Sequence, residues 1–358
     1  MRTKAWWLIP LLMGALLCCV AAQAEIILGD RDYVMPTPTP YLPPEPTPDP
    51  WPKTIVITVG GDCTLGSTDT LRASETGFDA VIAEKGYDWP FSQLLPVFAA
   101  DDLTLVNFEG ALTESRDRVE KSFNFKGPAD YARMLTLGSV EAVTLANNHA
   151  LDYGEAGRAD TMAALDAAGI TYCAPNAPAV YEVRGVKIGL IGHTFPYKDG
   201  KRDISADVDS LRAAGCQIII ASFHWGSEYE FAFNRDQRTI GRAAIRSGAD
   251  VVVGHHPHVI QGIERFEESY ILYSLGNLVF GGNRDPQERD TYVAQLTFTV
   301  YEDGRAEGPA LKILPARLTE RKSGTDYRPI FAEGDEAERI LKAILRRSYQ
   351  MEDFVNPN

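Results

Sequence analysis

The chain has 358 residues, of which 45% are hydrophobic and 23% charged, and its formal net charge at pH 7 is −14. This composition excludes a wholly disordered chain, because it supplies enough apolar side chains for the buried core of one large domain or two modest ones. The negative charge gives the protein no electrostatic reason to bind nucleic acid, so we expect no nucleic-acid partner.

Residues 1–24 have the features of a secretory signal peptide. Arg2 and Lys4 precede an uncharged run from residue 5 to residue 22, and the sequence Ala-Gln-Ala at 22–24 fits a cleavage site. We therefore expect export, either to the extracellular face of the membrane or as a secreted protein. Because the apolar run reaches the lower length limit for crossing a bilayer, an uncleaved membrane anchor is the alternative. A lipid-modified Cys18 or Cys19 would be a third way to tether the chain.

Residues 25–53 form a predicted linker. Proline occupies nearly every second position from Pro36 to Pro52, which excludes helix and interior strand and favours extended polyproline II. Such a stiff segment separates a domain from whatever holds its other end, and this favours a membrane tether. An ordered arm that lies on the domain is the alternative.

A predicted domain follows, from residue 54 to residue 320. Apolar runs of strand length occur at 54–62, 103–109, 140–149, 186–193, 217–225 and 249–258. Most are continuous rather than alternating, as expected of strands that are covered on both faces. Stretches with helical spacing lie between them, at 128–137, 155–168, 205–214 and 235–247. This alternation predicts βαβ units, an α/β fold and a largely parallel sheet.

The C-terminal part has a different pattern. Segments 259–266, 270–275, 291–301 and 305–314 follow one another with glycine turns and no helix between them, so we expect antiparallel strands of a second sheet. Residues 335–348 predict an amphipathic helix in a C-terminal extension, 321–358, that packs on the domain. Only Cys63, Cys173 and Cys216 remain after residue 24, and this odd number argues against a disulfide framework.

All six histidines, at positions 149, 193, 224, 255, 256 and 258, stand at or just after the end of an apolar strand-like run. Because ligands of open α/β sheets bind outside the carboxyl ends of the strands, these side chains should converge on one crevice. Asp62 and Glu109 follow their own strands in the same way and add oxygen ligands. Nitrogen and oxygen together suit Mn, Fe or Zn, and a shared carboxylate would allow one or two ions.

The six histidines are not equally strong candidates for metal ligands. A lone His193 after a strand is more typical of a structural histidine, whereas three histidines around Pro257 are typical of a metal site. In an extended chain, His256 and His258 point to one side and His255 to the other. We therefore predict His256 and His258 as ligands and give His255 a secondary place.

Two further segments add candidates. In the segment LANNHALDYG, Asn148 can offer its amide oxygen to a metal, and Asp152 can orient His149 or cap the helix that follows. In the segment SFHWGSEYE, His224 stands in register with the other histidines. Glu228 and Glu230 in the same segment are interpreted as ordinary solvated charges.

Seven sequence blocks together resemble one family. They are GGDCTLG (60–66), NFEGALT (107–113), FKGP (125–128), LANNHALDYG (145–154), FHWGSEY (223–229), GHHPHVIQG (254–262) and YSLGNLVF (273–280). As an ordered set over residues 54–300 they resemble the CapA family of poly-γ-glutamate capsule synthesis proteins, which is itself similar to the calcineurin-like metallophosphoesterases. Any one block alone would be a weak signal.

The resemblance implies a four-layer α/β/β/α sandwich with a metallophosphoesterase-like site and a cell-envelope setting. It implies metal-ligand roles for Asp62, Glu109, Asn148, His149, His224, His256 and His258. We further predict that His149 is a catalytic acid or electrostatic stabiliser with Asp152 as its catalytic partner, and that Asn107, Lys126, Asn147 and Asn277 contact the substrate. Two departures matter. The first phosphoesterase block reads Asp-x-His, but Thr64 stands in the histidine position here. The second block supplies an aspartate, where Asn107 and Glu109 stand here.

These observations predict a protein for the synthesis, export or processing of poly-γ-glutamate or a related capsule polymer, with a metal-dependent hydrolase-like site. An anionic polymer is the expected substrate, and a membrane synthase complex is a possible partner. Two other functions stay open. One is a metal-dependent phosphodiesterase or phosphatase that acts on a small phosphoester. The other is a non-catalytic scaffold subunit of a polymer-synthesising membrane complex.

Overall fold

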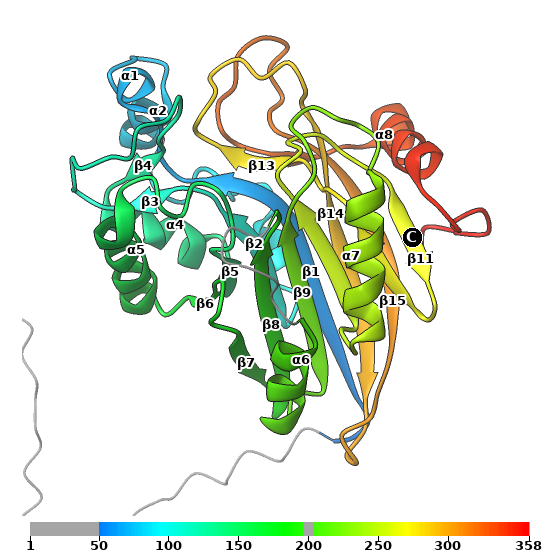
Figure 1. Cartoon of the computed structure of the whole chain (residues 1–358). Coiled ribbons are helices and arrows are strands. Elements are labelled where there is room, and N and C mark those ends of the chain that lie inside the picture. The colour runs from blue at the N-terminus through cyan, green and yellow to red at the C-terminus, as the bar shows by residue number, and fades with distance from the viewer. Residues whose placement is uncertain (1–49, 197–203, 358) are drawn as a thin grey trace, which may run out of the picture. The chain divides into compact units, whose positions relative to one another are not determined.

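The computed structural model describes residues 50–196 and 204–357, which form two β-sheets packed face to face with helices on their outer sides (Figure 1). The predicted signal peptide, residues 1–24, lies outside these residues. So does the predicted linker, apart from its last four positions.

The first sheet has eight strands in the order β16-β15-β14-β1-β2-β5-β6, and β13 pairs with the C-terminal end of β1. Its parallel strands are β1 (Lys53–Thr64), β2 (Leu103–Phe108), β5 (Ala142–Thr144), β6 (Thr171–Cys173) and β13 (Asn277–Phe280). Its antiparallel strands are β14 (Asp290–Val300), β15 (Ala306–Arg317) and β16 (Ile330–Phe331). Two short strands, β3 (Ala111–Leu112) and β4 (Lys126–Gly127), pair only with each other among the named strands. Of the two, β3 packs against helix α5.

The second sheet has six strands in the order β11-β12-β10-β9-β8-β7. They are β7 (Ala179–Val183), β8 (Val186–Thr194), β9 (Ile218–His224), β10 (Val251–His255), β11 (Ile263–Phe266) and β12 (Ser269–Leu272). The central strands β8, β9, β10 and β12 run parallel, and β7 and β11 close the two edges as antiparallel strands.

The helices complete the four layers. The outer side of the first sheet carries α1 (Asp69–Arg72), α2 (Phe78–Lys85), α3 (Leu95–Phe98), a 3₁₀ turn (Ala129–Tyr131), α4 (Ala132–Leu137) and α5 (Gly154–Ala168). The outer side of the second carries α6 (Ile204–Ala213) and α7 (Arg235–Arg246). The last helix, α8 (Gly334–Arg347), contacts β15 and β11, and its Ile340 and Ile344 enter the core between the sheets.

The central strands of both sheets contribute to two hydrophobic cores, one on each face of the strand. In β9, Ile218 and Ile220 belong to the core between the sheets, while Ile219 and Ala221 face α6 and α7. In β2, Leu105 faces the other sheet and Val106 faces the helices of the first layer. Burial on both faces explains the continuous apolar runs of the sequence. The predicted α/β/β/α sandwich is confirmed.

The four C-terminal segments form two antiparallel hairpins, as expected, but the prediction that they belong to one sheet is wrong. The hairpin of β11 and β12 extends the parallel sheet, because β12 pairs in parallel with β10. The hairpin of β14 and β15 instead pairs with β1, from Lys53 opposite Val300 to Val59 opposite Ala294. The C-terminal strands are thus divided between the two sheets. Alternating apolar residues say which face of a strand is buried, but not which sheet it joins.

Other predictions of elements hold with shifted ends. The run 140–149 contains only the short strand β5, because its last residues leave the sheet as a loop. The predicted helix 335–348 is confirmed as α8. Cys63, Cys173 and Cys216 are all buried and free, so no disulfide joins them. No helix within residues 50–196 and 204–357 is long and apolar enough to cross a membrane.

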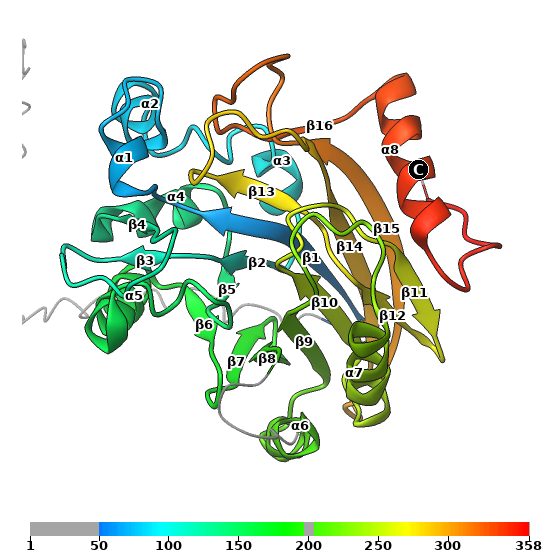
Figure 2. The same ribbon diagram turned by 45° about the horizontal axis from the view of Figure 1, so that its top comes forward.

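The carboxyl ends of β1, β2 and β5 from the first sheet meet those of β9 and β10 from the second. Figure 2, in which the top of Figure 1 comes forward, shows β13 beside the end of β1 at this edge. The loops that follow these strands therefore carry their side chains to one place.

Candidate metal centre

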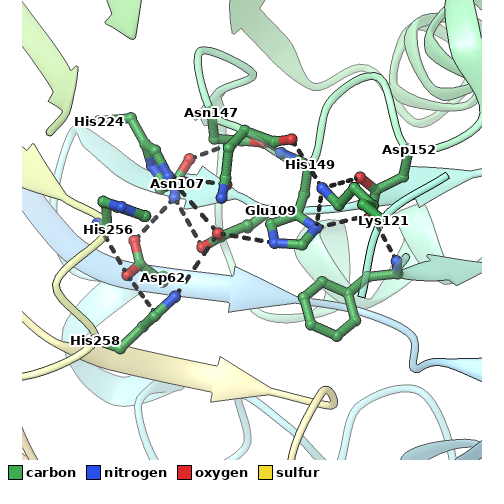
Figure 3. Close-up of polar contacts among 12 residues, drawn as sticks. Asp62, Asn107, Glu109, Lys121, Asn147, His149, Asp152, His224, His256 and His258 are labelled. Carbon is green, nitrogen blue, oxygen red and sulfur yellow. Dashed lines mark hydrogen bonds and ion pairs between the residues drawn. The ribbon is translucent and has the colours of Figure 1, made fainter. Parts of the chain in front are cut away.

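The predicted ligands come together at this edge (Figure 3). Asp62 lies near the end of β1, Glu109 follows β2, and Asn147, Asn148 and His149 follow β5. His224 and His255 are the last residues of β9 and β10, and His256 and His258 lie in the loop after β10. The strand ends of both sheets thus contribute to one polar cluster.

Two buried carboxylates form its base. Asp62 and Glu109 have no solvent-exposed surface. The amide of Asn107 donates to both, at 2.8 Å from Asp62 Oδ1 and 3.5 Å from Glu109 Oε2. The amide of Asn147 donates in turn to Asn107 Oδ1 at 3.0 Å. Asn107 and Asn147, both predicted to contact substrate, therefore hold the carboxylates in place.

One carboxylate oxygen stands at the centre. Glu109 Oε1 is buried and accepts no hydrogen bond from the described residues. Three imidazole nitrogens surround it, with His224 Nε2 at 3.7 Å and the Nε2 atoms of His149 and His258 each at 3.9 Å. These distances are too long for hydrogen bonds. They match two ligands of one tetrahedral ion, which lie about 3 to 4 Å apart when each is about 2.1 Å from the metal.

The loop after β10 differs from the extended chain expected from the sequence. His256 and His258 have φ angles of 97° and 57°, in the region that non-glycine residues rarely adopt. Because the backbone turns there, His255 also faces the site, with Nδ1 3.2 Å from Asp62 Oδ1. The prediction that His255 points away is wrong.

The ring of His258 is held so that one nitrogen stays available. Its Nδ1 lies 2.9 Å from Asn277 Oδ1 and 3.2 Å from Asp62 Oδ2. A proton on Nδ1 satisfies these acceptors and leaves Nε2, which faces Glu109, as a metal donor. Asn277, predicted to contact substrate, thus orients a candidate ligand.

His224 is positioned by its neighbours in the cluster. Its Nε2 lies 3.0 Å from Asn148 Oδ1, and its ring lies 4.5 Å from the ring of His256. Burial lowers the pKa of His224 well below its usual value, and the neighbouring His256 lowers it further. Burial and His258 likewise lower the pKa of His256. Both imidazoles are therefore neutral near pH 7, as metal ligation requires.

A second chain of contacts supports His149. Its Nδ1 lies 2.7 Å from Asp152 Oδ2, and Lys121 Nζ lies 2.5 Å from Asp152 Oδ1. The ring packs on Phe125 at 4.4 Å between centroids. Burial lowers the pKa of His149, although the carboxylate of Asp152 opposes this effect. Sequence reasoning missed Lys121, because it stands in an exposed segment of mixed charge that has no strand-end signal.

The two carboxyls differ in their electrostatics. Burial raises the pKa of Asp62, but hydrogen bonds and charge from His255 and His258 outweigh burial and hold it well below the usual value. Burial raises the pKa of Glu109 to about 8, despite the opposing charge of His258. Burial alone would lower the pKa of His258, but Glu109 and Asp62 raise it to about 10. The cluster therefore favours positive charge, which bound divalent cations would supply in place of protons.

Three sets of three residues each bring their donor atoms together. Within each set, the donor atoms lie within 4.8 Å of one another. The sets are Glu109 with His224 and His256, Asp62 with Glu109 and His258, and Glu228 with His256 and His258. Mixed nitrogen and oxygen donors of this kind fit Mn, Fe or Zn. Glu228 was expected to be only a solvated charge. It is exposed, but its carboxylate reaches the histidines at the mouth of the cluster.

Some predicted residues lie apart. Lys126 bonds the carbonyl of Ser115 and lies over the Tyr153 ring at 4.8 Å, and no contact among the described residues joins it to the cluster. His193 faces Asp207 of α6, at 3.2 Å between Nε2 and Oδ2, as expected of a structural histidine. Thr64, in the position of the missing ligand, is buried, and its hydroxyl has no hydrogen-bond partner in the part of the chain described.

Comparisons with known proteins found a matching family model and similar sequences. A family model described as bacterial capsule synthesis protein PGA_cap matches residues 56–282. The PGA biosynthesis protein CapA of Bacillus subtilis (strain 168) is 32% identical over 273 residues, which cover 67% of this chain and 71% of that protein. The capsule biosynthesis protein CapA of Bacillus anthracis is 27% identical over 228 residues, 56% of each chain.

Solved structures show a more distant likeness. The crystal structure of a hypothetical protein from Thermus thermophilus aligns with 73% of this chain and 99% of its own, at 15% identity and a TM-score of 0.44.

Proposed function

The chain belongs to the bacterial capsule synthesis protein family PGA_cap, and on that premise we propose that it processes an anionic capsule polymer of the poly-γ-glutamate type at a metal-dependent, hydrolase-like centre. The reaction is hydrolysis or transfer at an acyl linkage of the polymer. The proposal includes an exported location, on the extracellular face of the membrane or secreted, which the uncharged run of residues 5–22 supports.

The observation that carries the proposal is the setting of Glu109 Oε1. It is a buried carboxylate oxygen that accepts no hydrogen bond from the described residues, and the Nε2 atoms of His149, His224 and His258 surround it at 3.7 to 3.9 Å. A cluster built only for stability would leave no such group unpaired, because a buried polar atom without a partner is costly. Asp62, Glu109, Asn148, His224, His256 and His258 would hold one or two divalent ions of Mn, Fe or Zn.

The bound ion would polarise a carbonyl oxygen and lower the pKa of a coordinated water. The other residues then have distinct tasks. Asp152, fixed by Lys121, accepts a hydrogen bond from the Nδ1–H of His149, and this orients the Nε2 atom of His149 toward Glu109. His149 is thereby placed to take up a proton at Nε2 and return it to the leaving group. Asn107 and Asn147 keep the carboxylates from moving during this step.

The test is turnover by the full chain, purified without chelator. We expect cleavage of a γ-linked oligoglutamate that depends on Mn, Fe or Zn. His149→Gln should lose about 100-fold or more of the rate while it keeps its metal, because it removes only the proton transfer. The double variant with His256→Ala and His258→Ala should lose both the activity and the bound metal. Glu230→Gln, an exposed acid on the adjoining loop, is the matched control and should change neither.

The comparison substrates separate the alternatives. Cleavage of an aryl phosphodiester but not of oligoglutamate would support a phosphodiesterase instead. A folded, metal-loaded protein that cleaves neither but copurifies with a membrane synthase would support the scaffold function. Full turnover by the double variant would exclude the proposed centre.

A further inference from the structure

A cationic groove lies along the end of α8, beside the loop that leads from His224 to α7. Resting on the proposed function, we propose that Arg346 forms a subsite that binds a carboxylate of the anionic polymer outside the metal centre. The subsite would hold one part of the polymer chain while another part lies at the strand ends.

Arg346 is exposed, and it has no hydrogen bond or ion pair with any of the described residues. Other cations of α8 are paired. Arg339 lies 2.7 Å from each carboxylate oxygen of Asp290, and Lys342 pairs with Glu338. A cation in the last turn of a helix is favourable in itself. That effect does not explain why this guanidinium stands free between two hollows.

The two hollows share Arg346. The first, of about 410 Å³, is lined by Phe231, Ala232, Phe233, Arg346 and Arg347. The second, of about 460 Å³, is lined by Lys342, Leu345, Arg346, Ser348, Met351, Glu352 and Phe354. Together they form one groove with apolar walls, three cations and a single acid among the lining residues. Such a surface suits a chain that alternates methylene groups with carboxylates.

The walls of the first hollow are fixed before any ligand binds. Phe233 stacks on Tyr273 at 3.8 Å between centroids, and the guanidinium of Arg347 lies 4.4 Å from the Phe231 ring. Arg347 also donates to the carbonyl of Ile260 at 2.9 Å. Because these side chains are already ordered, binding would cost little further conformational entropy.

The same loop joins the groove to the metal centre. Glu228 reaches His256 and His258, and the backbone N–H of Tyr229 donates to the carbonyl of Pro257 at 2.8 Å. Phe231, which lines the groove, is only three residues beyond Glu228, so their Cα atoms lie at most about 11 Å apart. A short stretch of chain thus joins the wall of the groove to the residues of the metal centre. In both ribbon views, α8 lies at the end of the molecule where β13 lies (Figures 1 and 2).

The net negative charge of the protein strengthens the case that Arg346 binds the polymer. At a formal charge of −14, the protein repels a polyanion at long range, so attraction must come from local cations. Screening at physiological salt limits the repulsion to about 8 Å and leaves a direct guanidinium–carboxylate contact effective.

The experiment measures binding of a fluorescent γ-linked oligoglutamate to the full-length protein. Arg346→Gln should weaken binding about tenfold or more, the loss expected for one hydrogen bond to a charged group. Arg346→Lys should keep part of the affinity, because it keeps the charge. Arg133→Gln removes an exposed helical arginine from α4, which lies on the outer side of the first sheet and lines neither hollow, and it should leave binding unchanged.

Two outcomes would overturn the subsite. One is an equal affinity for the Arg346→Gln and Arg133→Gln proteins. The other is tighter binding of a glycerol phosphate oligomer than of oligoglutamate, which would assign the groove to a phosphate polymer. The binding experiment also distinguishes a failure of the subsite from a failure of the proposed reaction. Arg346-dependent binding without any turnover would contradict the reaction and keep the subsite, and turnover with Arg346-independent binding would do the reverse.

Discussion

At the scale of single residues, Asn107 links the two buried carboxylates. Its amide is the group that donates to both Asp62 and Glu109. Groups that orient metal ligands typically contribute 10- to 100-fold to metal affinity, a rough range that we expect Asn107→Ala to lose. A competitive titration with a chromophoric chelator measures this. Asn356→Ala is the control. It removes two hydrogen bonds between the Asn356 side chain and the backbone of Ile313, which is not part of the cluster, and it should bind metal like the unchanged protein. Equal affinity of the two variants would show that Asn107 does not orient the ligands.

A second residue predicts the pH dependence of stability. Burial raises the pKa of Asp101 to about 7, and although the Thr58 and Thr104 hydroxyls oppose this, Glu141 and Asp102 add to it. Between about pH 4 and pH 7 the folded protein therefore binds a proton that the unfolded chain has lost. This contribution to the free energy of unfolding falls as pH rises through that range.

Asp101→Asn removes this titration. Relative to the unchanged protein, the variant should gain stability as the pH rises from about 4 to 7, and the gain should level off above that range. Urea unfolding at several pH values measures the difference. Parallel stability curves for the Asp101→Asn and unchanged proteins would contradict the raised pKa.

Much of the centre follows from residue type and position. Asp62, Glu109, His149, His224 and the histidines after residue 254 could be found because each stands at a strand end. The side-chain directions of His255, His256 and His258 could not, because they depend on two positive φ angles. Lys121 and Glu228 reach the cluster from exposed loops, where sequence alone cannot tell a contact from a solvated charge.

At the scale of elements, the parallel pairing of β1 and β13 positions the metal centre. Asp62 donates its backbone N–H to the carbonyl of Gly276 at 3.0 Å, and it pairs with Asn277. Gly61 permits this approach, because a Cβ at that position would lie 2.0 Å from the carbonyl oxygen of Gly276. A side chain there would push the two strands apart.

Gly61→Ala should therefore cost about 1 to 3 kcal/mol of unfolding free energy, as overpacked sites do. It should also reduce metal binding, because Asp62 and Asn277 lie on the displaced strands. Gly304→Ala is the matched control. Its Cβ meets nothing within 4 Å, so only the φ angle of 87° strains it, and it should keep its metal. Normal metal content in both variants would show that the pairing of β1 with β13 does not position the centre.

Long elements were predictable and short ones were not. The helix α7 could be found from its helical spacing, and its Asn234 and Gln237 form a capping box. The strands β3, β4 and β16 have two residues each, too few for any period to show. The strand β13 lies in a recognised sequence block, but its parallel pairing with β1 depends on chain segments that are distant in sequence.

At the scale of the whole molecule, two sheets share one functional edge. The first sheet supplies the carboxylates and the second supplies most of the imidazoles, so the centre exists only when both layers are packed. The sequence predicted the convergence of strand ends. It could not assign each strand to a sheet, because the inward faces of β1, β9, β10 and β14 are all apolar and contribute to one core.

Elemental analysis of the full chain, purified without chelator, tests most directly whether this edge is a metal centre. We predict one or two Mn, Fe or Zn ions per chain. Glu109→Gln should lose metal, because Glu109 belongs to two of the three ligand groups, while Glu230→Gln should keep the full content. A protein that contains no such metal, takes up none when Mn, Fe or Zn is added, and stays folded and active would contradict this account.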